Sequence, residues 1–416
     1  MNRGGTLGSI SALFDDMEQA NEAHTLLCVA ELKGIPDLRV VRERVTNLSY
    51  VFPTFSSVVE ERAGVVSPYK AWVHKEIDCE RHIEIFDHAT FKKSSFGALL
   101  TRILNTAFES DIPRWKFHFV RYPKSDKSFF VVKISHVYGD GAMISHIFRS
   151  LCDGRPKSKE VPKRRGHSSF LYKIYALIAI ALVIVRHLFS RLASRKSRID
   201  VDRGDTRVVS YEEIMRWRLS DVRKIAKDKG VSINDVVHAL LFRAVAMYDG
   251  KSETLSSLSI FNTRRTAKVT SMDDTNDIGV VLVAVRAGEK SAREILFQVN
   301  NTMAHYKNSP MVPILSQISK MAYFLSPRLS LKAVDWFANK GTFGFSNYAT
   351  LLSELTVDGC EVVNLYNAVK PYKMGVFFSV LSYGDYINLS ACYKNGNMDD
   401  INYFKTCIER AYDELK

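Results

Sequence analysis

A predicted buried strand that runs into a histidine loop and then a helix constrains the fold of this chain more than any other feature. The apolar run over residues 129–134 predicts the strand, and His136 follows almost at once. A Gly-Asp-Gly turn at 139–141 lets the backbone approach a ligand closely, and a helix is predicted over residues 142–151. This layout holds an imidazole at a strand end in a cleft, as a positioned general base requires.

The residues alone leave two interpretations of Asp140, which lies four residues after His136. Its carboxylate either orients the imidazole ring or braces the loop. His136 also has a plainer alternative, because a lone buried histidine is most often a hydrogen-bonded core residue. The pattern therefore predicts that a proton is taken from a substrate, without naming that substrate.

The composition is that of a globular protein in a reducing compartment. With 416 residues the chain is long enough for two domains, and its 46% hydrophobic and 25% charged residues exclude a disordered chain. The six cysteines are scattered, with no C-x-x-C pair or Cys/His cluster at metal spacing. We expect an intracellular protein with no metal site, and the polar N-terminus does not read as a signal peptide.

The net charge of +13 is concentrated in one segment. Residues 155–198 hold twelve Lys or Arg and one Glu, a net charge of +11, which leaves +2 for the rest of the chain. These cations bracket an apolar run over residues 170–185, shorter than the roughly 20 residues of a bilayer span. We predict that the segment lies in, or dips into, a membrane; the alternative is a buried helix with solvated basic loops. Nucleic acid is not an expected partner, because the cations surround aliphatic residues and not stacking aromatics.

This segment divides the chain into residues 1–154, 155–204 and 205–416, which we predict to be two halves and a membrane-associated connection. The second half opens with a helix N-capped by Ser220, and the next helix begins after Ser232 or Asn234. Helices are predicted over 10–23, 38–48, 142–151, 221–229, 292–305 and 399–415, and strands over 25–32, 116–122, 129–134, 279–285, 376–381 and 386–392. This mixture predicts an α/β fold of two domains with the site between them.

Several short motifs carry a resemblance to a known family. The sequence from His136 to Gly141 (HVYGDG) resembles the His-x-x-x-Asp-Gly signature of chloramphenicol-acetyltransferase-like, coenzyme-A-dependent acyltransferases. Further segments, in the expected order, are similar to motifs of the wax ester synthase/diacylglycerol acyltransferase (WS/DGAT) family. These are Pro113-Arg114-Trp115, Asn234-Asp235, the strand ending at Arg264, Ser346-Asn347, and the hairpin between Gly375 and Asp400.

The chain departs from the family pattern in three places. The family has two histidines at the start of its signature, and the first is Ser135 here. The Ser-Asn motif continues with Tyr348-Ala349-Thr350 and lacks the family's proline-rich turn. The N-terminal motif is reduced to Ser11-Ala12-Leu13-Phe14-Asp15. The catalytic histidine survives these changes as His136.

The resemblance assigns a role to each motif residue. His136 is implied as the general base, with Asp140 and Gly141 as structural support and Arg264 as the partner of Asp140; Arg265 is the alternative partner. An oxyanion donor is sought among Ser346, Asn347 and backbone N–H groups. The residues implied to bind substrate are Pro113, Trp115, Asn234, Asp235, Ser346 and Asn347. Plainer alternatives are a core position for Trp115 and helix N-caps for Asn234 and Asp235.

The implied activity is transfer of a long acyl chain from acyl-CoA to a fatty alcohol or diacylglycerol, giving a wax ester, triacylglycerol or both. Acyl-CoA is a co-substrate, and no cofactor or metal is expected. The expected location is an intracellular membrane, the endoplasmic reticulum, with both catalytic halves in the cytosol. The rival hypotheses are a soluble acyltransferase acting on a polar alcohol or amine, and a catalytically silent lipid-binding or scaffold protein.

Overall fold

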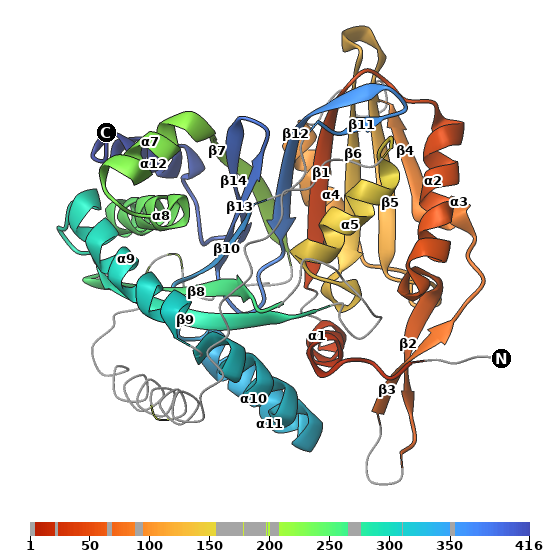
Figure 1. Cartoon of the computed structure of the whole chain (residues 1–416), viewed down its shortest axis with the longest axis horizontal. Coiled ribbons are helices and arrows are strands. Elements are labelled where there is room, and N and C mark those ends of the chain that lie inside the picture. The colour runs from red at the N-terminus through yellow and green to blue at the C-terminus, as the bar shows by residue number, and fades with distance from the viewer. Residues whose placement is uncertain are drawn as a thin grey trace.

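The computed structural model forms two domains, each built on a six-stranded sheet (Figure 1). The predicted membrane-associated connection lies outside the described residues, apart from three isolated positions, and so do Arg265 and Thr350. The described residues are 5–20, 24–64, 69–87, 95–154, 178, 197, 199, 208–264, 276–309, 311–349 and 354–416.

The first sheet has the order β11-β12-β1-β6-β5-β4. Its pairs are antiparallel except β4 with β5, which run parallel. The strands are β1 (Thr25–Lys33), β4 (Ile83–Asp87), β5 (Trp115–Tyr122), β6 (Lys127–Ser135), β11 (Thr356–Val357) and β12 (Cys360–Val369). The strand predicted over residues 129–134 is confirmed as β6, which lies between β1 and β5 and is buried along nearly its whole length.

The second sheet has the order β7-β14-β13-β10-β8-β9. In it β10 runs parallel to both β8 and β13, and the other pairs are antiparallel. The strands are β7 (Val209–Arg218), β8 (Thr254–Asn262), β9 (Ile278–Arg286), β10 (Phe343–Ala349), β13 (Val376–Tyr383) and β14 (Tyr386–Lys394). The predicted hairpin of β13 and β14 is confirmed, and a separate two-stranded sheet joins β2 (Ser57–Arg62) to β3 (Tyr69–His74).

Two strands from the second half of the chain belong to the first sheet. β12 pairs along β1, from Leu26 opposite Val369 to Lys33 opposite Glu361, and β11 extends the same edge. In Figure 1 the blue β12 lies beside the red β1. The α/β, two-domain architecture is therefore as predicted, but the two sheets do not divide at the middle segment. The boundaries at residues 154 and 204 stay a prediction.

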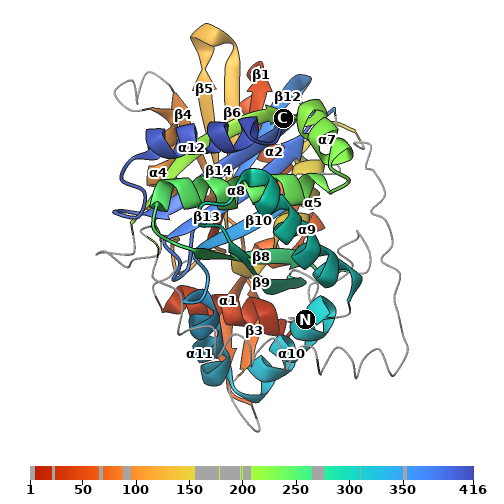
Figure 2. The ribbon, with the colours of Figure 1, turned by 90° about the vertical axis from the view of Figure 1, so that its left-hand side faces the viewer.

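Helices pack against the sheets, and three of them, α1, α10 and α11, gather at one end of the molecule (Figure 2). The helix α8 (Ile233–Asp249) packs against α7, α9 and α12. Its apolar residues Val236, Val237, Leu240, Leu241, Ala244 and Val245 are fully buried. The α-helices are α1 (Ser9–Gln19), α2 (Leu38–Val51), α3 (Cys79–His82), α4 (Phe96–Asn105), α5 (Gly141–Leu151), α7 (Leu219–Asp228), α8 (Ile233–Asp249), α9 (Ala292–Asn308), α10 (Met311–Leu325), α11 (Pro327–Ala338) and α12 (Ile401–Asp413). Short 3₁₀ turns are η1 (Pro53–Ser56), η3 (Pro123–Ser125) and η4 (His136–Tyr138).

The start of α7 differs from the prediction. The helix begins at Leu219, whose N–H donates to the backbone oxygen of Asp385 at 2.7 Å, and Ser220 does not cap it. The turn between β13 and β14 thus accepts an N–H at the start of the helix. From the sequence we expected the Ser220 side chain to cap this end of the helix. For α8, Ser232 is the cap: it and Asp235 form a reciprocal capping box.

No single helix in the described part of the chain has the length and apolar character needed to cross a bilayer. The pair α7 and α8, bent by 95° at their junction, passes that test on length and composition when taken together.

Candidate active site

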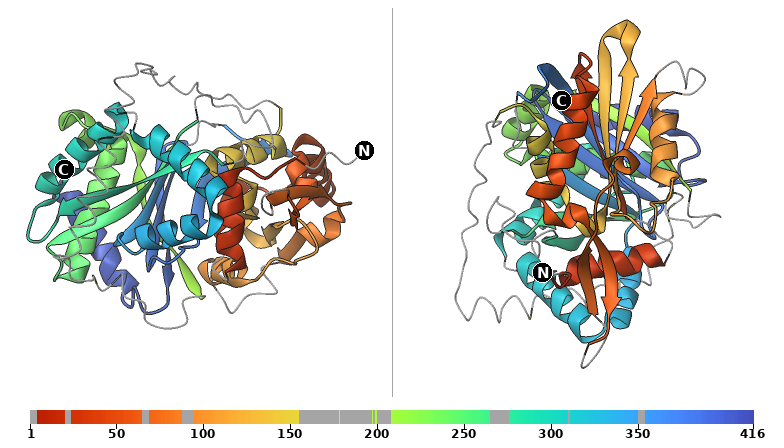
Figure 3. Two further views of the ribbon diagram at one scale, coloured as in Figure 1. Left: turned by 90° about the horizontal axis from the view of Figure 1, so that it is seen from below. Right: turned by 90° about the vertical axis from the view of Figure 1, so that its right-hand side faces the viewer.

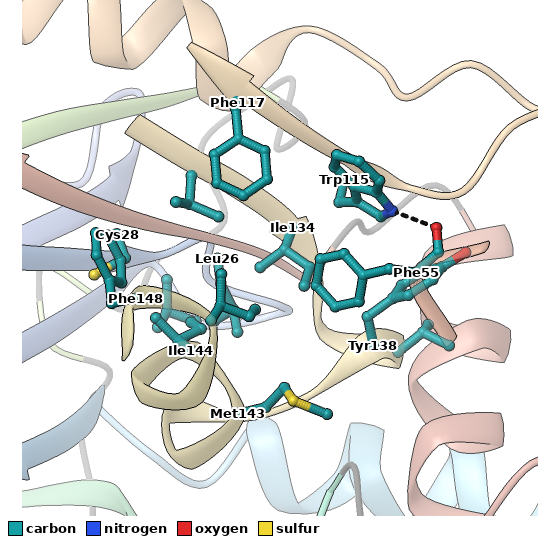
Figure 4. Close-up of a cluster of buried hydrophobic side chains, with 14 of the residues drawn as sticks. Leu26, Cys28, Phe55, Trp115, Phe117, Ile134, Tyr138, Met143, Ile144 and Phe148 are labelled. Atoms are coloured by element: carbon teal, nitrogen blue, oxygen red, sulfur yellow. Dashed lines mark hydrogen bonds between the residues drawn. The ribbon is translucent and has the colours of Figure 1, made fainter. Parts of the chain in front are cut away.

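The loop that carries His136 is anchored on both sides by the core. The His136 N–H donates to the backbone oxygen of His24 at 2.9 Å, which extends the pairing of β6 with β1 by one residue. The fully buried Tyr138 donates its hydroxyl to the backbone oxygen of Ser57 at 2.8 Å. Helix α5 follows and packs Met143 and Ile144 into the same apolar cluster (Figure 4). The strand, loop and helix predicted from sequence therefore hold His136 on a rigid support.

Asn276 fixes the orientation of the His136 ring. Its Nδ2 donates to Ser11 Oγ at 2.9 Å and to the His136 backbone oxygen at 2.7 Å. These two bonds turn Asn276 Oδ1 toward His136 Nδ1, 3.0 Å away. Because the amide oxygen only accepts, Nδ1 carries the proton and Nε2 keeps its lone pair. Nε2 is thus the nitrogen that can accept a proton from a substrate.

Aromatic rings surround the imidazole and keep it neutral. Phe14 stacks on His136 with ring centroids 4.0 Å apart, and His24 meets it edge-on at 6.1 Å. Burial lowers the pKa of His136, while the Asp140 carboxylate and the bond to Asn276 raise it in part. The pKa therefore stays below the usual value near 6.5, and the ring is an unprotonated base at neutral pH. Burial also lowers the pKa of His24, to about 3.

Asp140 braces the loop, as the second of the two sequence interpretations holds. Its Oδ1 accepts from the N–H groups of Ala142 and Met143 at the start of α5, at 3.0 and 3.4 Å. Its Oδ2 forms an ion pair with Arg264 and accepts the N–H of Asp277 at 3.2 Å. Both side chains of the ion pair are only 6% exposed. The predicted partnership with Arg264 is confirmed, and this pair ties the first domain to the end of the β8–β9 pair.

The ring of Tyr348 lies close against Gly141, so a larger residue at this position would require the ring to shift. A Cβ at this position would come within 3.1 Å of the Tyr348 ring. The Tyr348 hydroxyl lies 2.9 Å from Ser145 Oγ, one turn further along α5. The sequence after the Ser-Asn motif, which departs from the family pattern, thus packs β10 of the second domain directly on the His136 loop.

The two polar residues of the Ser-Asn motif face opposite sides of β10. Asn347 Nδ2 donates to Asn234 Oδ1 at 3.0 Å, on the side of α8. Side chains alternate along a strand, so Ser346 shares a face with Tyr348, which contacts the His136 loop. The structure therefore brings Asn234 and Asn347 together, and it turns Ser346 toward the side of the base.

Three other predicted substrate-binding residues have contacts that favour a structural role, as a helix cap or as part of the core. Asp235 accepts from its N-cap partner and from Lys307 Nζ at 3.0 Å, so capping accounts for its carboxylate. Trp115 is buried, with its Nε1–H donated to the backbone oxygen of Phe55 at 2.9 Å (Figure 4). Pro113 is buried and accepts the Trp115 N–H at 2.9 Å. Their role in binding stays a prediction.

A buried charged network replaces the first histidine of the family signature. Ser135 Oγ donates to Glu18 Oε2 at 2.6 Å, and Arg114 pairs with Glu18 at 2.8 Å and with Asp15 at 2.5 Å. Lys70 pairs with Asp15 at 2.5 Å. Burial raises the pKa of Glu18, which Arg114 opposes. The network holds α1, and so Phe14, against the loop.

Sequence reasoning missed Asn276 and undervalued the N-terminal motif. Ser11 bonds Asn276, Phe14 stacks on the base, and Asp15 anchors the network, so three of the five motif residues support the site. Asn276 lies two residues before β9, in a polar run just before a predicted strand, which is the signal that could have marked it. Among the described residues, no group of three His, Cys, Asp or Glu side chains is arranged to hold a metal ion.

Comparison with known proteins identifies the family of this chain. The fold is shared with the wax ester synthase/diacylglycerol acyltransferase from Marinobacter aquaeolei VT8, at a TM-score of 0.67 and 15% identity over 99% of this chain and 98% of that one. It is also shared with the trichothecene 15-O-acetyltransferase from Fusarium sporotrichioides (TM-score 0.66, 11% identity, 98% and 95% covered) and with the first condensation domain of the calcium-dependent antibiotic synthetase (0.66, 10%, 100% and 95%).

No curated protein sequence matches the chain. Two family models do: the wax ester synthase/diacylglycerol acyltransferase catalytic domain matches residues 7–169, and the WS/DGAT C-terminal domain matches residues 275–416. The chain belongs to the wax ester synthase/diacylglycerol acyltransferase family of acyltransferases.

Proposed function

We propose that this protein transfers a long acyl chain from acyl-CoA to a lipophilic alcohol, forming a wax ester, triacylglycerol or both. The observation that supports it most is the fixed tautomer of His136, with Nδ1–H directed to Asn276 and the Nε2 lone pair available. A base in this form can deprotonate a hydroxyl, and the thioester needs no further activation.

In the proposed reaction His136 Nε2 takes the proton of the acceptor hydroxyl while its oxygen attacks the thioester carbonyl carbon. The new C–O bond gives a tetrahedral oxyanion, which collapses by breaking the C–S bond. The imidazolium returns its proton to the leaving sulfur, giving ester and free CoA. General-base help of this kind contributes roughly 10² to 10⁴ in rate.

We assign the oxyanion donor to Ser346. Its strand β10 packs on the His136 loop through Tyr348 and Gly141, and Ser346 lies on the same face of that strand as Tyr348. Asn347, on the other face, already donates to Asn234. Removal of one oxyanion donor costs about 10² to 10³ in kcat, so Ser346→Ala is expected to lower kcat to that extent.

Family membership and the sequence in the middle of the chain support the proposed acceptor class. The apolar run at 170–185, with its basic flanks, supports an acceptor dissolved in a membrane and a location at an intracellular membrane such as the endoplasmic reticulum. In this proposal residues 1–154 and 205–416 form the cytosolic catalytic halves, joined by the membrane-associated connection 155–204. Acyl-CoA is the co-substrate, with no further cofactor.

The experiment supplies labelled palmitoyl-CoA to membranes containing the full chain, with a fatty alcohol, a diacylglycerol, a short polar alcohol and an amine as separate acceptors. Ester formation on either lipophilic acceptor, lost in His136→Ala but kept in the matched variant His305→Ala, is the expected result; His305 is exposed on α9. Products only on the polar alcohol or amine would favour the soluble-acyltransferase alternative. No product on any acceptor would favour a silent lipid-binding protein.

A further inference from the structure

The helix pair α10–α11 exposes a cluster of large apolar side chains. Ile318, Met321, Phe324, Leu325 and Leu329 are between 39% and 81% exposed. In a monomeric soluble protein such residues are normally scattered singly, and a gathered set of them marks an interaction surface. We call these five residues the apolar tip, since they lie toward the turn between the two helices.

Three residues of the apolar tip lie on one face of the amphipathic helix α10. Ile318, Met321 and Leu325 follow the i, i+3, i+7 spacing of a single helix face. The opposite face of α10 is buried against α1 and β9, where Val312 and Tyr323 contribute to the core. The exposed apolar residues are therefore not the by-product of a poorly packed helix.

Polar contacts fix this helix pair beside the site. The Tyr323 hydroxyl donates to Asp16 of α1 at 2.7 Å, and Lys320 Nζ pairs with Asp277 at 3.1 Å. Asp277 is the residue whose N–H bonds Asp140, and α1 carries the ring stacked on His136. Figures 2 and 3 both show α1 lying against α10 and α11 at one end of the molecule. The apolar tip is thus held rigidly one helix away from the base.

The charged residues in the segment that carries the apolar tip are all positive. Residues 311–334 contain Lys320, Arg328 and Lys332 and no Asp or Glu. Arg328 and Lys332 are exposed next to Leu329. Apolar side chains flanked by cations complement an anionic bilayer, where the former enter the acyl boundary and the latter meet the headgroups.

We infer that the apolar tip docks on the surface of an anionic lipid bilayer and so presents the His136 site to a membrane-dissolved acceptor. Docking of the apolar tip does not depend on the proposed reaction. The delivery of an acceptor to His136 rests on the proposed function. This surface is distinct from residues 155–204 and adds a second contact in the catalytic part of the chain.

The test is cosedimentation of the full chain with phosphatidylcholine vesicles, with and without phosphatidylserine. The double variant Phe324→Glu/Leu325→Glu is expected to lower the partition coefficient by about tenfold or more, as loss of one or two buried apolar side chains implies. Phe297→Glu, at a phenylalanine on α9 that is 66% exposed, is the matched control and should bind like the wild type. Unchanged thermal unfolding of both variants confirms that they fold.

A second variant separates charge from apolar insertion. Arg328→Glu/Lys332→Glu is expected to weaken binding to phosphatidylserine vesicles about 30-fold or more and to leave binding to pure phosphatidylcholine unchanged. If both double variants partition like the wild type, because residues 155–204 account for all binding, the inference is overturned. It is equally overturned if the variants change only the oligomeric state, since the apolar tip would then be a contact between copies.

Activity measurements tell failure of the docking from failure of the proposed function. With diacylglycerol in vesicles, Phe324→Glu/Leu325→Glu should lose rate in proportion to its lost binding, and with a short water-soluble alcohol it should match the wild type. A wild type that binds vesicles through the apolar tip but esterifies neither acceptor would refute the reaction and keep the docking. Equal loss of rate on both acceptors would refute the docking.

Discussion

His136 and His238 occupy two regions of the molecule that differ in exposure and in their partners. His238 is fully buried, whereas His136 is partly exposed. His238 lies in the buried core of the second domain, stacked on Phe345 at 4.3 Å, with its Nε2 2.7 Å from Ser257 Oγ. His136 lies at the contact of the two domains, and its Nδ1 partner Asn276 comes from the second of them. The His238 ring is thus held by residues of a single domain, and the His136 ring is held by residues of both domains.

The two environments move the pKa values to different degrees. Burial, together with the nearby positive charge of Lys307, lowers the pKa of His238 to about 3. Burial lowers the pKa of His136 as well, but Asp140 and Asn276 oppose it. Burial alone therefore makes a histidine an inert packing residue, whereas burial offset by partners that favour the charged form leaves a base that can still accept a proton.

The largest expected effect contrasts the two histidines directly. His136→Ala should lower kcat by about 10² to 10⁴ and change the free energy of unfolding by less than about 1 kcal/mol. His238→Ala should leave kcat at 25 °C within about threefold and lower the free energy of unfolding by about 2 to 4 kcal/mol, because it opens a cavity in a packed core. Steady-state kinetics and urea unfolding check both. A drop in kcat of the same size in both variants would erase the distinction.

The next effect concerns the ion pair that joins the domains at the His136 loop. Arg264→Met leaves the Asp140 carboxylate buried without its cation and should lower the free energy of unfolding by about 3 to 5 kcal/mol. The double variant Asp140→Asn/Arg264→Met removes both charges and should recover part of that loss, as a double-mutant cycle in urea would measure. Lys290→Met breaks an exposed pair with Glu294 and should cost less than about 0.5 kcal/mol. A double variant less stable than Arg264→Met would contradict the account.

A smaller effect is the dependence of stability on pH. His238 keeps a pKa of about 3 when folded and regains about 6.5 when unfolded, so below pH 6.5 the unfolded chain binds a proton that the folded chain does not. Its contribution should fall by about 1.4 kcal/mol per pH unit below pH 6.5 and be constant above it. Urea unfolding at several pH values should show a smaller slope in His238→Gln than in the wild type. Equal slopes would place the titration elsewhere.

The sequence predicted the parts of the site that are local in the chain. The strand, the His136 loop and helix α5 depend on apolar periodicity and on turn residues within about twenty positions, and all three are present. The partnership of Asp140 with Arg264 was predicted from family motifs, because no local pattern relates residues 124 positions apart. The start of α8 after Ser232 was one of two alternatives that the sequence left open, the other being a start after Asn234, and the structure has Ser232 as the N-cap.

What sequence did not predict depends on contacts between distant segments. Asn276 meets His136 across 140 positions, and a lone polar residue in a polar run carries no sign of such a partner. β12 comes from the second half of the chain but pairs with β1 of the first half. The pattern of apolar and polar residues along β12 does not indicate which of the two sheets it joins. Helix α7 begins at Leu219 and is not capped by Ser220, because the backbone oxygen of Asp385 in the β13–β14 turn accepts the Leu219 N–H. Tertiary contacts settled each of these.

The most delicate test changes the partner of His136 and leaves the histidine in place. In the proposed reaction His136 acts as a base in its neutral form, so kcat/KM should fall as pH drops through the His136 pKa, which burial places below 6.5. Asn276→Asp puts a carboxylate beside Nδ1, favours the protonated ring and should move that acid limb up by about one pH unit. Asn276→Ala removes a partner that raises the pKa, so its limb should move down while kcat falls about tenfold because the ring is no longer oriented. If the acid limb of kcat/KM falls at the same pH in all three proteins and only kcat changes, Asn276 supports the fold and does not alter the pKa of His136.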